Sequence, residues 1–250
     1  MKKLVMILVL LVSLVACSST ENDTASTWSD ELMRNDVIVV ATSPDYPPYE
    51  TIDEETGEIT GFDIEMFEAI ADMLGVEVQW QAMEFSTIVS AVQTGQVDLG
   101  VSGFSYDPEK QVLFSEPYYT SSQTILYLAE DGYTSIDDLS GKTVAAQLGT
   151  TCYDLLSSYE DIETVTGTDA AVLVEALRTG AYDGVCLDTP VAQNYCANDD
   201  SFAMLEAIAE DSYSIIASSD HELLIDKIDE CLAEFLQTQE YADLLAKWGI

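Results

Sequence analysis

The chain has 250 residues, a formal net charge of −38 and a mean hydropathy of +0.10. Eight Lys and Arg face 46 Asp and Glu, so the surface repels phosphate backbones, which argues against nucleic acid or an anionic membrane surface as a partner. The acidic residues lack the D-x-[DN]-x-[DN]-G spacing of a calcium loop. We therefore expect no metal and no cofactor, and a solvated surface explains the charge. A folded body of about 215 residues is large enough for two modest domains.

The first segment, MKKLVMILVLLVSLVACSST, joins two lysines to an apolar run at 4–16 that only Ser13 interrupts. This run is too short for a permanent membrane span. It ends in Leu-Val-Ala-Cys, which resembles the lipobox of bacterial lipoproteins. We therefore predict a lipoprotein signal peptide at 1–17, lipidation of Cys17 and a flexible, polar tether at 18–35. The alternative is a plain secretory signal with an incidental cysteine. Either way the protein is expected outside the cytoplasm, and with the lipid it is held at the outer face of the cell membrane.

Four further cysteines, at 152, 186, 196 and 231, lie in the folded region. An exported protein can form disulfides but need not, so their pairing stays open. Cys231 falls on an apolar helical stripe and is expected to be a buried free thiol. There is no Cys-x-x-Cys pair and His221 is the only histidine, which argues against a structural zinc site.

From residue 36 onward, short apolar runs alternate with helical periods, which is typical of an α/β protein. In the helix expected at 61–75, Asp63 is available to cap the start and Gly75 to end it. The other expected elements, in chain order, are strands at 36–42, 76–80 and 96–102, a helix at 86–95, strands at 123–130 and 141–149, a helix from 152, a strand at 212–218, a helix at 220–237 and a last helix that contains Leu244, Leu245 and Trp248.

One pattern occurs twice, since AVQTGQVDLGVSG at 91–103 aligns without gaps on ALRTGAYDGVCLD at 176–188. Each copy predicts a helix, a glycine stop, a strand and a polar residue at the strand's carboxyl end, where α/β sheets gather ligands. Two similar lobes that face one cleft follow from this. We place lobe 1 at 36–124 and 217–250, which makes it discontinuous, and lobe 2 at 125–216, with two strands linking them.

The region from about residue 36 to 250 resembles the bacterial extracellular solute-binding proteins of family 3, which deliver polar amino acids to ATP-driven importers. The resemblance is carried by a series of stretches in their order along the chain: PDYPPYE (44–50), TGFDIEMFEAIADMLGVEVQW (60–80), AVQTGQVDLGVSGFSYDPEK (91–110), LFSEPYY (113–119), GKTVAAQLGTT (141–151), DGVCLDTPVA (183–192) and LLAKWG (244–249). It implies the type II periplasmic-binding-protein-like fold, in which each lobe is a mostly parallel sheet flanked by helices and the ligand lies between the lobes.

The same resemblance implies contacts to the ligand from lobe 1. Tyr46 and Phe85 would enclose the ligand side chain, with Tyr49 as a less certain neighbour. Ser102 and Ser105 would supply hydroxyl and backbone contacts. Ordinary core packing is the alternative for the aromatic residues, and turn hydrogen bonding is the alternative for the serines.

Two charged residues would hold the two poles of an amino acid. Lys110 stands where the family typically has an arginine that binds the α-carboxylate, and a lysine offers a compact charge in place of a planar fork. Asp188 matches the acid that receives the ammonium group, and the backbone amides around Thr150 and Thr151 would also meet the carboxylate. The alternatives are neutralisation of nearby acids by Lys110, an N-cap role for Thr150 and a helix-entry role for Asp188.

Opposite poles on opposite lobes predict capture by closure of the lobes, followed by recognition of the closed form by permease subunits of an ABC transporter. We expect a monomer that takes a small amino acid or similar zwitterion, with a neutral ligand preferred and an anionic one disfavoured by the charge. The alternatives are an enzyme of the cyclohexadienyl-dehydratase type and a sensory ligand-binding domain. No nucleophile with an adjacent base is visible, so we expect no catalysis.

Overall fold

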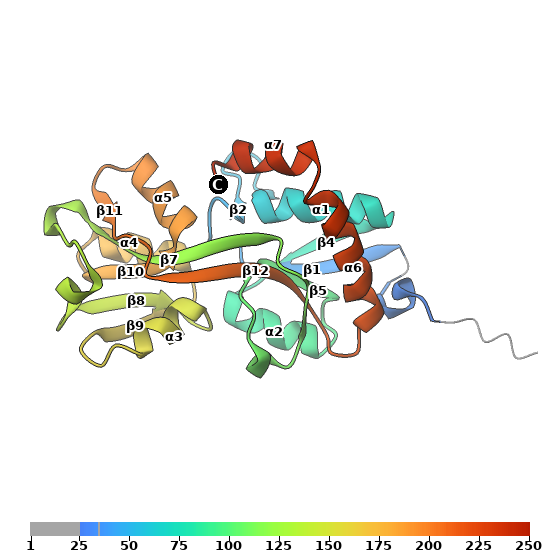
Figure 1. Cartoon of the computed structure of the whole chain (residues 1–250), viewed down its shortest axis with the longest axis horizontal. Coiled ribbons are helices and arrows are strands. Elements are labelled where there is room, and N and C mark those ends of the chain that lie inside the picture. Colours follow the sequence, from blue (N-terminus) through green and yellow to red (C-terminus); the bar gives the residue numbers. More distant parts are fainter. Residues whose placement is uncertain (1–25, 35) are drawn as a thin grey trace, which may run out of the picture.

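The structure is a computed structural model, and it describes residues 26–34 and 36–250. It has two lobes joined by two long strands, which confirms the predicted two-lobed α/β architecture (Figure 1). The predicted signal peptide and Cys17 lie outside the described residues. Within the described ranges, each helix is too short or too polar to cross a bilayer.

Lobe 1 is built on a parallel core of three strands, with β1 (Val37–Thr42) between β4 (Glu77–Ala82) and β5 (Leu99–Phe104). Helix α2 (Phe85–Gln93) covers one face of this sheet and a group of three helices covers the other (Figure 1). That group consists of α1 (Phe62–Leu74), α6 (Glu222–Phe235) and α7 (Gln239–Trp248). The short strands of this lobe are β2 (Thr51–Ile52), β3 (Ile59–Thr60) and β6 (Leu113–Phe114).

Lobe 2 repeats this plan, with β8 in the middle of a parallel group whose outer strands are β9 and β10. Its elements are β8 (Thr143–Gln147), α3 (Thr151–Ser157), β9 (Glu163–Gly167), α4 (Ala170–Arg178), β10 (Gly184–Asp188), α5 (Thr189–Asn198) and β11 (Phe202–Met204). Helices α4 and α5 pack on one face of the sheet and α3 packs on the other.

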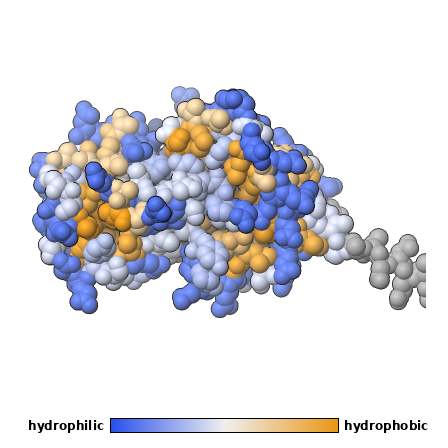
Figure 2. All heavy atoms as spheres, in the orientation of Figure 1, coloured by the Kyte–Doolittle hydropathy of each residue, from blue (hydrophilic) through white to orange (hydrophobic). Residues whose placement is uncertain are grey.

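The lobes are linked by two antiparallel strands, β7 (Tyr119–Leu128) and β12 (Ala209–Ala217). The first part of β12 pairs with β7, and its last part pairs with β5 in lobe 1. Strand β7 goes on to pair with β10 in lobe 2, so one continuous sheet runs through both lobes. In the view of Figure 2, strongly hydrophilic residues spread around the outline of both lobes, while the strip between them has intermediate hydropathy.

The repeated sequence occupies equivalent places in the two lobes. In both copies a helix ends at a glycine with positive φ, +66° at Gly95 and +75° at Gly180, and a strand follows. The shared aspartates also make equivalent hydrogen bonds. Asp98 accepts the backbone N–H of Val39 in β1 at 2.7 Å, and Asp183 accepts that of Thr143 in β8 at 2.9 Å. In each lobe, the repeat therefore contains the aspartate that binds the backbone of the central strand.

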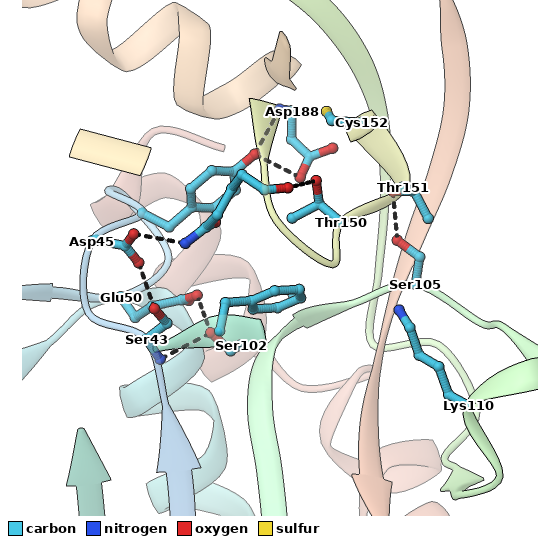
Figure 3. Close-up of a pocket in the computed structure, with 14 residues that line it drawn as sticks. Ser43, Asp45, Glu50, Ser102, Ser105, Lys110, Thr150, Thr151, Cys152 and Asp188 are labelled. Atoms are coloured by element: carbon cyan, nitrogen blue, oxygen red, sulfur yellow. Dashed lines mark hydrogen bonds between the residues drawn. The ribbon is translucent and has the colours of Figure 1, made fainter. Parts of the chain in front are cut away.

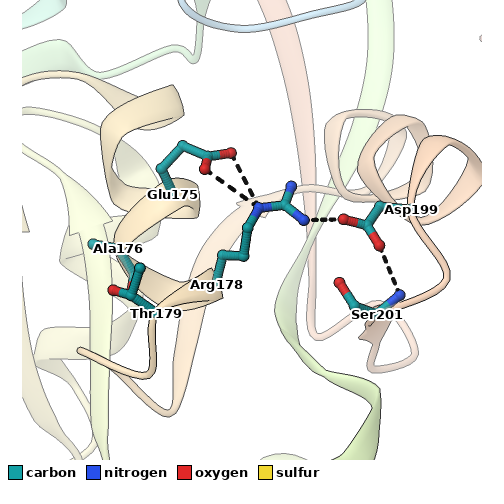
Figure 4. Close-up of polar contacts among 6 residues, drawn as sticks. All are labelled: Glu175, Ala176, Arg178, Thr179, Asp199 and Ser201. Atoms are coloured by element: carbon teal, nitrogen blue, oxygen red, sulfur yellow. Dashed lines mark hydrogen bonds and ion pairs between the residues drawn. The ribbon is translucent and has the colours of Figure 1, made fainter.

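An ion cluster on the surface of lobe 2 joins α4 to the end of α5 (Figure 4). The Arg178 guanidinium pairs with Glu175 and with Asp199, and it lies 4.7 Å from the ring centre of Phe202. Because such exposed pairs contribute at most about 1 kcal/mol each, we assign this cluster a structural role.

Two predicted features differ from the structure. The N-cap of α1 is Gly61, and Asp63 is fully buried and accepts hydrogen bonds from Tyr118 and Gly103, so it does not cap α1. A side chain at position 61 would place its Cβ 2.0 Å from the carbonyl oxygen of Tyr49, which explains the glycine. The second difference lies in the predicted tether, where Trp28–Glu31 forms a 3-10 helix packed on α6 and Glu31 accepts the N–H groups of Leu223 and Leu224 at 3.3 and 2.8 Å.

Candidate functional site

A cavity lies between the lobes, and all eight residues predicted to bind ligand line it (Figure 3). Its empty volume, including open solvent at the mouth, is about 420 Å³. The eight are Tyr46, Phe85, Ser102, Ser105, Lys110, Thr150, Thr151 and Asp188; the other lining residues are Ser43, Asp45, Glu50, Gly103, Gln147 and Cys152.

Strand ends build much of this lining. Ser43 directly follows β1, Ser102 lies near the end of β5, and Gln147 and Asp188 are the last residues of β8 and β10. The carboxyl ends of parallel strands in the two lobes thus converge on one cleft, as expected for α/β sheets.

Asp188 is the buried carboxylate of lobe 2, with 8% of its surface exposed. Its Oδ2 accepts the hydroxyl proton of Tyr46 at 3.0 Å, and its buried Oδ1 has no hydrogen-bond partner within 3.5 Å among the described residues, although the Tyr213 hydroxyl is near enough to lower the pKa of Asp188. Burial, followed by the charge of Asp211, raises the pKa of Asp188 to about 7. Asp188 stands at the N-cap position of α5 but makes no capping bond with its side chain, so the helix-entry alternative lacks its defining contact. The free oxygen is a ready acceptor for an ammonium group.

Lys110 belongs to lobe 1, at the end of the 3-10 helix Pro108–Lys110, and only 18% of its side chain is exposed. Its ammonium group points toward Ser105 at the cavity wall (Figure 3). The contact with Asp107 is long, 4.0 Å, so simple neutralisation of that acid accounts poorly for its position. Burial lowers the pKa of Lys110, while the charges of Asp107, Asp154 and Asp211 oppose this shift.

The hydroxyl groups beside Lys110 come from both lobes. Ser105 and Thr151 lie 3.3 Å apart across the cleft. Thr151 also donates to Asp211 at 2.9 Å. Thr150 caps α3, since its hydroxyl oxygen accepts the N–H of Tyr153 at 3.3 Å, and it lines the cavity at the same time. The N-cap alternative for Thr150 is therefore compatible with a place in the site.

The aromatic residues divide into two kinds. Tyr46 and Phe85 line the cavity, and Phe85 also stacks on Phe104 with ring centres 4.8 Å apart. Tyr49 is fully buried and packs edge-on against Tyr213 at 4.9 Å. Tyr49 does not line the cavity, so its role is core packing.

A second buried carboxylate, Glu50, lines the lobe 1 side of the cavity and is 1% exposed. It accepts the hydroxyl proton of Ser102 at 2.6 Å and lies beside the buried Asp63. Burial and the charge of Asp63 raise the pKa of Glu50, and burial raises that of Asp63 to about 7. Two buried carboxyl groups in contact disfavour double ionisation, so this pair retains a proton near neutral pH.

Three polar residues of the lining, Glu50, Asp45 and Gln147, were not predicted from the sequence. Glu50 and Asp45 both stand in the motif PDYPPYE, within five residues of Tyr46. Gln147 lies inside the strand predicted at 141–149 and is the last residue of the observed strand β8. A polar residue at a strand's carboxyl end is the signal that would have found it.

The histidine and cysteines offer little chemistry at this site. His221 stands at the N-cap of α6, away from the cavity lining. All four cysteines of the folded region are free, and Cys231 is buried as predicted. Over 26–34 and 36–250, no three His, Cys, Asp or Glu side chains are grouped so as to hold a metal ion.

Comparison with known proteins agrees with this geometry. Residues 38–250 match the model of the bacterial extracellular solute-binding proteins, family 3. The arginine-binding extracellular protein ArtP of Bacillus subtilis is 33% identical, and the alignment covers 99% of this chain and 98% of that protein. The putative ABC transporter arginine-binding protein 2 of Escherichia coli is 28% identical over 85% of this chain and 90% of its own.

Solved structures give the same result. A mutant arginine-binding protein from T. maritima superposes with a TM-score of 0.81 at 30% identity, covering 86% of this chain and 95% of its own. The amino acid ABC transporter substrate-binding protein AbpA of Streptococcus pneumoniae, bound to L-arginine, superposes with a TM-score of 0.80 at 30% identity, over 85% of this chain and 94% of its own.

Proposed function

Because the chain belongs to the bacterial extracellular solute-binding proteins of family 3, we propose that it captures a cationic amino acid, L-arginine foremost, for an ABC importer. Several relatives are named as arginine-binding proteins. A cationic ligand differs from the neutral zwitterion that the sequence alone favours, and the charge of the cavity is the reason for the change.

The observation that carries this proposal is the set of charges on the cavity lining. Three acids, Asp45, Glu50 and Asp188, face a single cation, Lys110. With Glu50 protonated and Asp188 ionised, as it is above pH 7, two carboxylates oppose one ammonium group. An amino acid with an uncharged side chain leaves this excess negative charge unchanged, whereas a cationic side chain neutralises it. An anionic side chain adds a third negative charge in a site that is largely removed from water, where it is costly.

In the pose that we propose, the α-carboxylate meets Lys110 and the hydroxyl of Ser105, and the α-ammonium meets the free oxygen of Asp188. The aliphatic stem of the ligand lies between Tyr46 and Phe85, with its charged end toward Glu50, while the oxygens of Asp45 keep their hydrogen bonds to the protein. Since the partners belong to different lobes, the contacts are complete only in the closed form. A micromolar complex, about −8 kcal/mol, is within reach of such a ligand.

The location of the protein is part of the same proposal. Lipidation at Cys17 would hold the protein at the outer face of the membrane, where the closed form can meet permease subunits as a monomer. We assign no catalytic activity, because the relatives named above are binding proteins and because the carboxyl group nearest to a cavity hydroxyl, that of Glu50 at 2.6 Å from Ser102, has a raised pKa. The cavity's single thiol, Cys152, has a pKa raised by burial, which disfavours its nucleophilic form.

Titration calorimetry with two isosteric ligands tests the charge argument directly. L-Citrulline has nearly the shape of L-arginine but a neutral side chain. We expect L-arginine to bind, L-citrulline to bind at least about tenfold more weakly, and L-glutamate to give no heat. Equal affinity for arginine and citrulline would contradict the preference for a cation. If none of the twenty amino acids bound, capture of amino acids itself would be wrong.

A further inference from the structure

Asp45 joins the two lobes through contacts that need no ligand. It follows β1 in lobe 1, where the hydroxyl of Ser43 donates to its Oδ1 at 2.7 Å. Its Oδ2 accepts the side-chain amide of Gln147 at 2.8 Å and the backbone N–H of Ala170 at 2.6 Å, and both donors belong to lobe 2. One carboxylate therefore makes two charge-assisted hydrogen bonds across the cleft.

Both donors are held in place by lobe 2 itself. The amide of Gln147 also donates to the carbonyl of Thr168 at 3.0 Å, and Gln147 is only 5% exposed. Ala170 is the first residue of α4, a helix of nine residues. The preceding Asp169 uses its side chain to accept the N–H of Val172 at 2.8 Å, so the N–H of Ala170 remains available for Asp45. A carboxylate at this end of a helix is also favoured by the helix dipole.

Two other side-chain bonds across the cleft involve groups that the ligand would contact, whereas Ser122 and Gln123 make their bonds to lobe 2 from the linking strand β7. Tyr46 bonds Asp188, and Ser105 bonds Thr151. A ligand that uses Asp188 and Ser105 competes for these groups or rearranges them. The bonds of Asp45 with Gln147 and Ala170 leave both of those groups free.

The closed arrangement brings backbone against backbone elsewhere along the cleft. Gly149, in the loop after β8, has a φ of +86°, and a Cβ added to it would lie 3.5 Å from the Cα of Ser86 in α2. Lobe 2 thus rests directly on lobe 1, and the bonds of Asp45 form only at this short separation.

We infer that Asp45 is a closure latch: a positioning residue that stabilises the closed arrangement of the lobes and slows release of the ligand. This inference rests on the proposed capture by lobe closure, but it does not depend on which amino acid is captured. When the lobes separate, Asp45 returns to water and the N–H of Ala170 loses its acceptor.

Hydrogen exchange at Ala170 in the ligand-free protein is the first test. We expect Asp45→Ala to speed exchange of this amide about tenfold or more and to increase the radius of gyration measured by X-ray scattering. The matched control is Asp53→Ala, which removes an exposed carboxylate that is bonded only within its own turn. This control should leave both quantities unchanged.

The second test uses L-arginine and stopped-flow fluorescence. The latch predicts that Asp45→Ala raises the dissociation rate about tenfold or more while the association rate changes less than about twofold. Gln147→Leu removes a donor from the opposite lobe and should act in the same direction, so the result does not depend on one variant folding well. Unchanged exchange at Ala170 and an unchanged dissociation rate in both variants would overturn the inference. If the wild type does not bind L-arginine, the proposed ligand fails, and the exchange measurement alone decides on the latch.

Discussion

Replacing Asp188 by asparagine should weaken ligand binding strongly while leaving the fold intact. The amide keeps the shape of the carboxyl group, and its oxygen can still accept the hydroxyl proton of Tyr46. Asp188 is 8% exposed, so the lost charge faces little water. A charge pair at about 4 Å and an effective dielectric near 20 amounts to about 4 kcal/mol before desolvation. Removing one partner of a buried charge pair costs about 2–5 kcal/mol, which is roughly a 30- to 5000-fold rise in Kd.

The same residue predicts a pH dependence with a definite sign. The pKa of Asp188 is raised to about 7 in the absence of ligand, and a bound ammonium group lowers it. Affinity is therefore fully developed above pH 7 and is lost as the pH falls below 7, because the ligand must displace a proton. The loss approaches tenfold per pH unit for one proton. In the Asp188→Asn variant this group no longer titrates, so the affinity should not fall in this way below pH 7.

Titration calorimetry with L-arginine between pH 5 and pH 8.5 measures both effects. The control is Glu77→Gln, which changes the net charge equally at an exposed position on β4. The reasoning would be refuted if Asp188→Asn bound within threefold of the wild type at pH 8. A wild-type affinity that is flat across pH 7 would refute the assignment of the proton to Asp188.

Three further predictions concern other residues. Lys110→Met should raise the Kd for L-arginine by about tenfold to a hundredfold in calorimetry. For argininamide, which lacks the carboxylate, the Kd of this variant and that of the wild type should be nearly equal. Lys227→Met, which removes an exposed pair with Glu230, is the control and should bind like the wild type. The pKa of Asp63 is raised from 3.8 to about 7, so the folded protein holds a proton that the unfolded chain releases, and the free energy of unfolding should fall as the pH rises from about 4 to about 7. Asp63→Asn should flatten this fall in ligand-free thermal denaturation, and an unchanged pH profile would contradict the assignment. Cys17→Ser should move the protein from the detergent phase of a Triton X-114 partition to the aqueous phase, and retention in the detergent phase would argue against the lipid anchor.

The two-lobed architecture could be predicted from the sequence because the repeat at 91–103 and 176–188 encodes it locally. Each copy contains the helix, the glycine stop and the strand in order, and each shared aspartate binds the central strand of its own lobe. Patterns of this kind depend on near neighbours in the chain, which is why strand and helix positions followed from periodicity.

The predictions that differed depend on distant contacts. Asp63 has the right residue type for a cap, but α1 begins two residues earlier, with Gly61 as its N-cap, and the Asp63 carboxylate accepts hydrogen bonds from Tyr118 and Gly103 instead. Trp28 lies in a polar stretch without a period, and its packing on α6 comes from a helix almost 200 residues away in the chain. Neither contact can be predicted from the neighbouring residues in the sequence.

The candidate site shows the same division. Its eight predicted residues stand in motifs that lie at strand ends, in the loops that follow them or in the first turns of the next helices. Asp45 and Gln147 are 102 positions apart in the chain and belong to different lobes, so they meet only when the lobes come together. A periodic pattern describes one element at a time and gives no information about a bond that forms across a cleft.

A crystal structure of the protein with L-arginine tests the central claim most directly. It should show the α-carboxylate within hydrogen-bonding distance of Lys110 Nζ in lobe 1 and the α-ammonium within that distance of Asp188 in lobe 2. A ligand that contacts only one lobe, or a Lys110 side chain that points away from the ligand into solvent, would contradict the account.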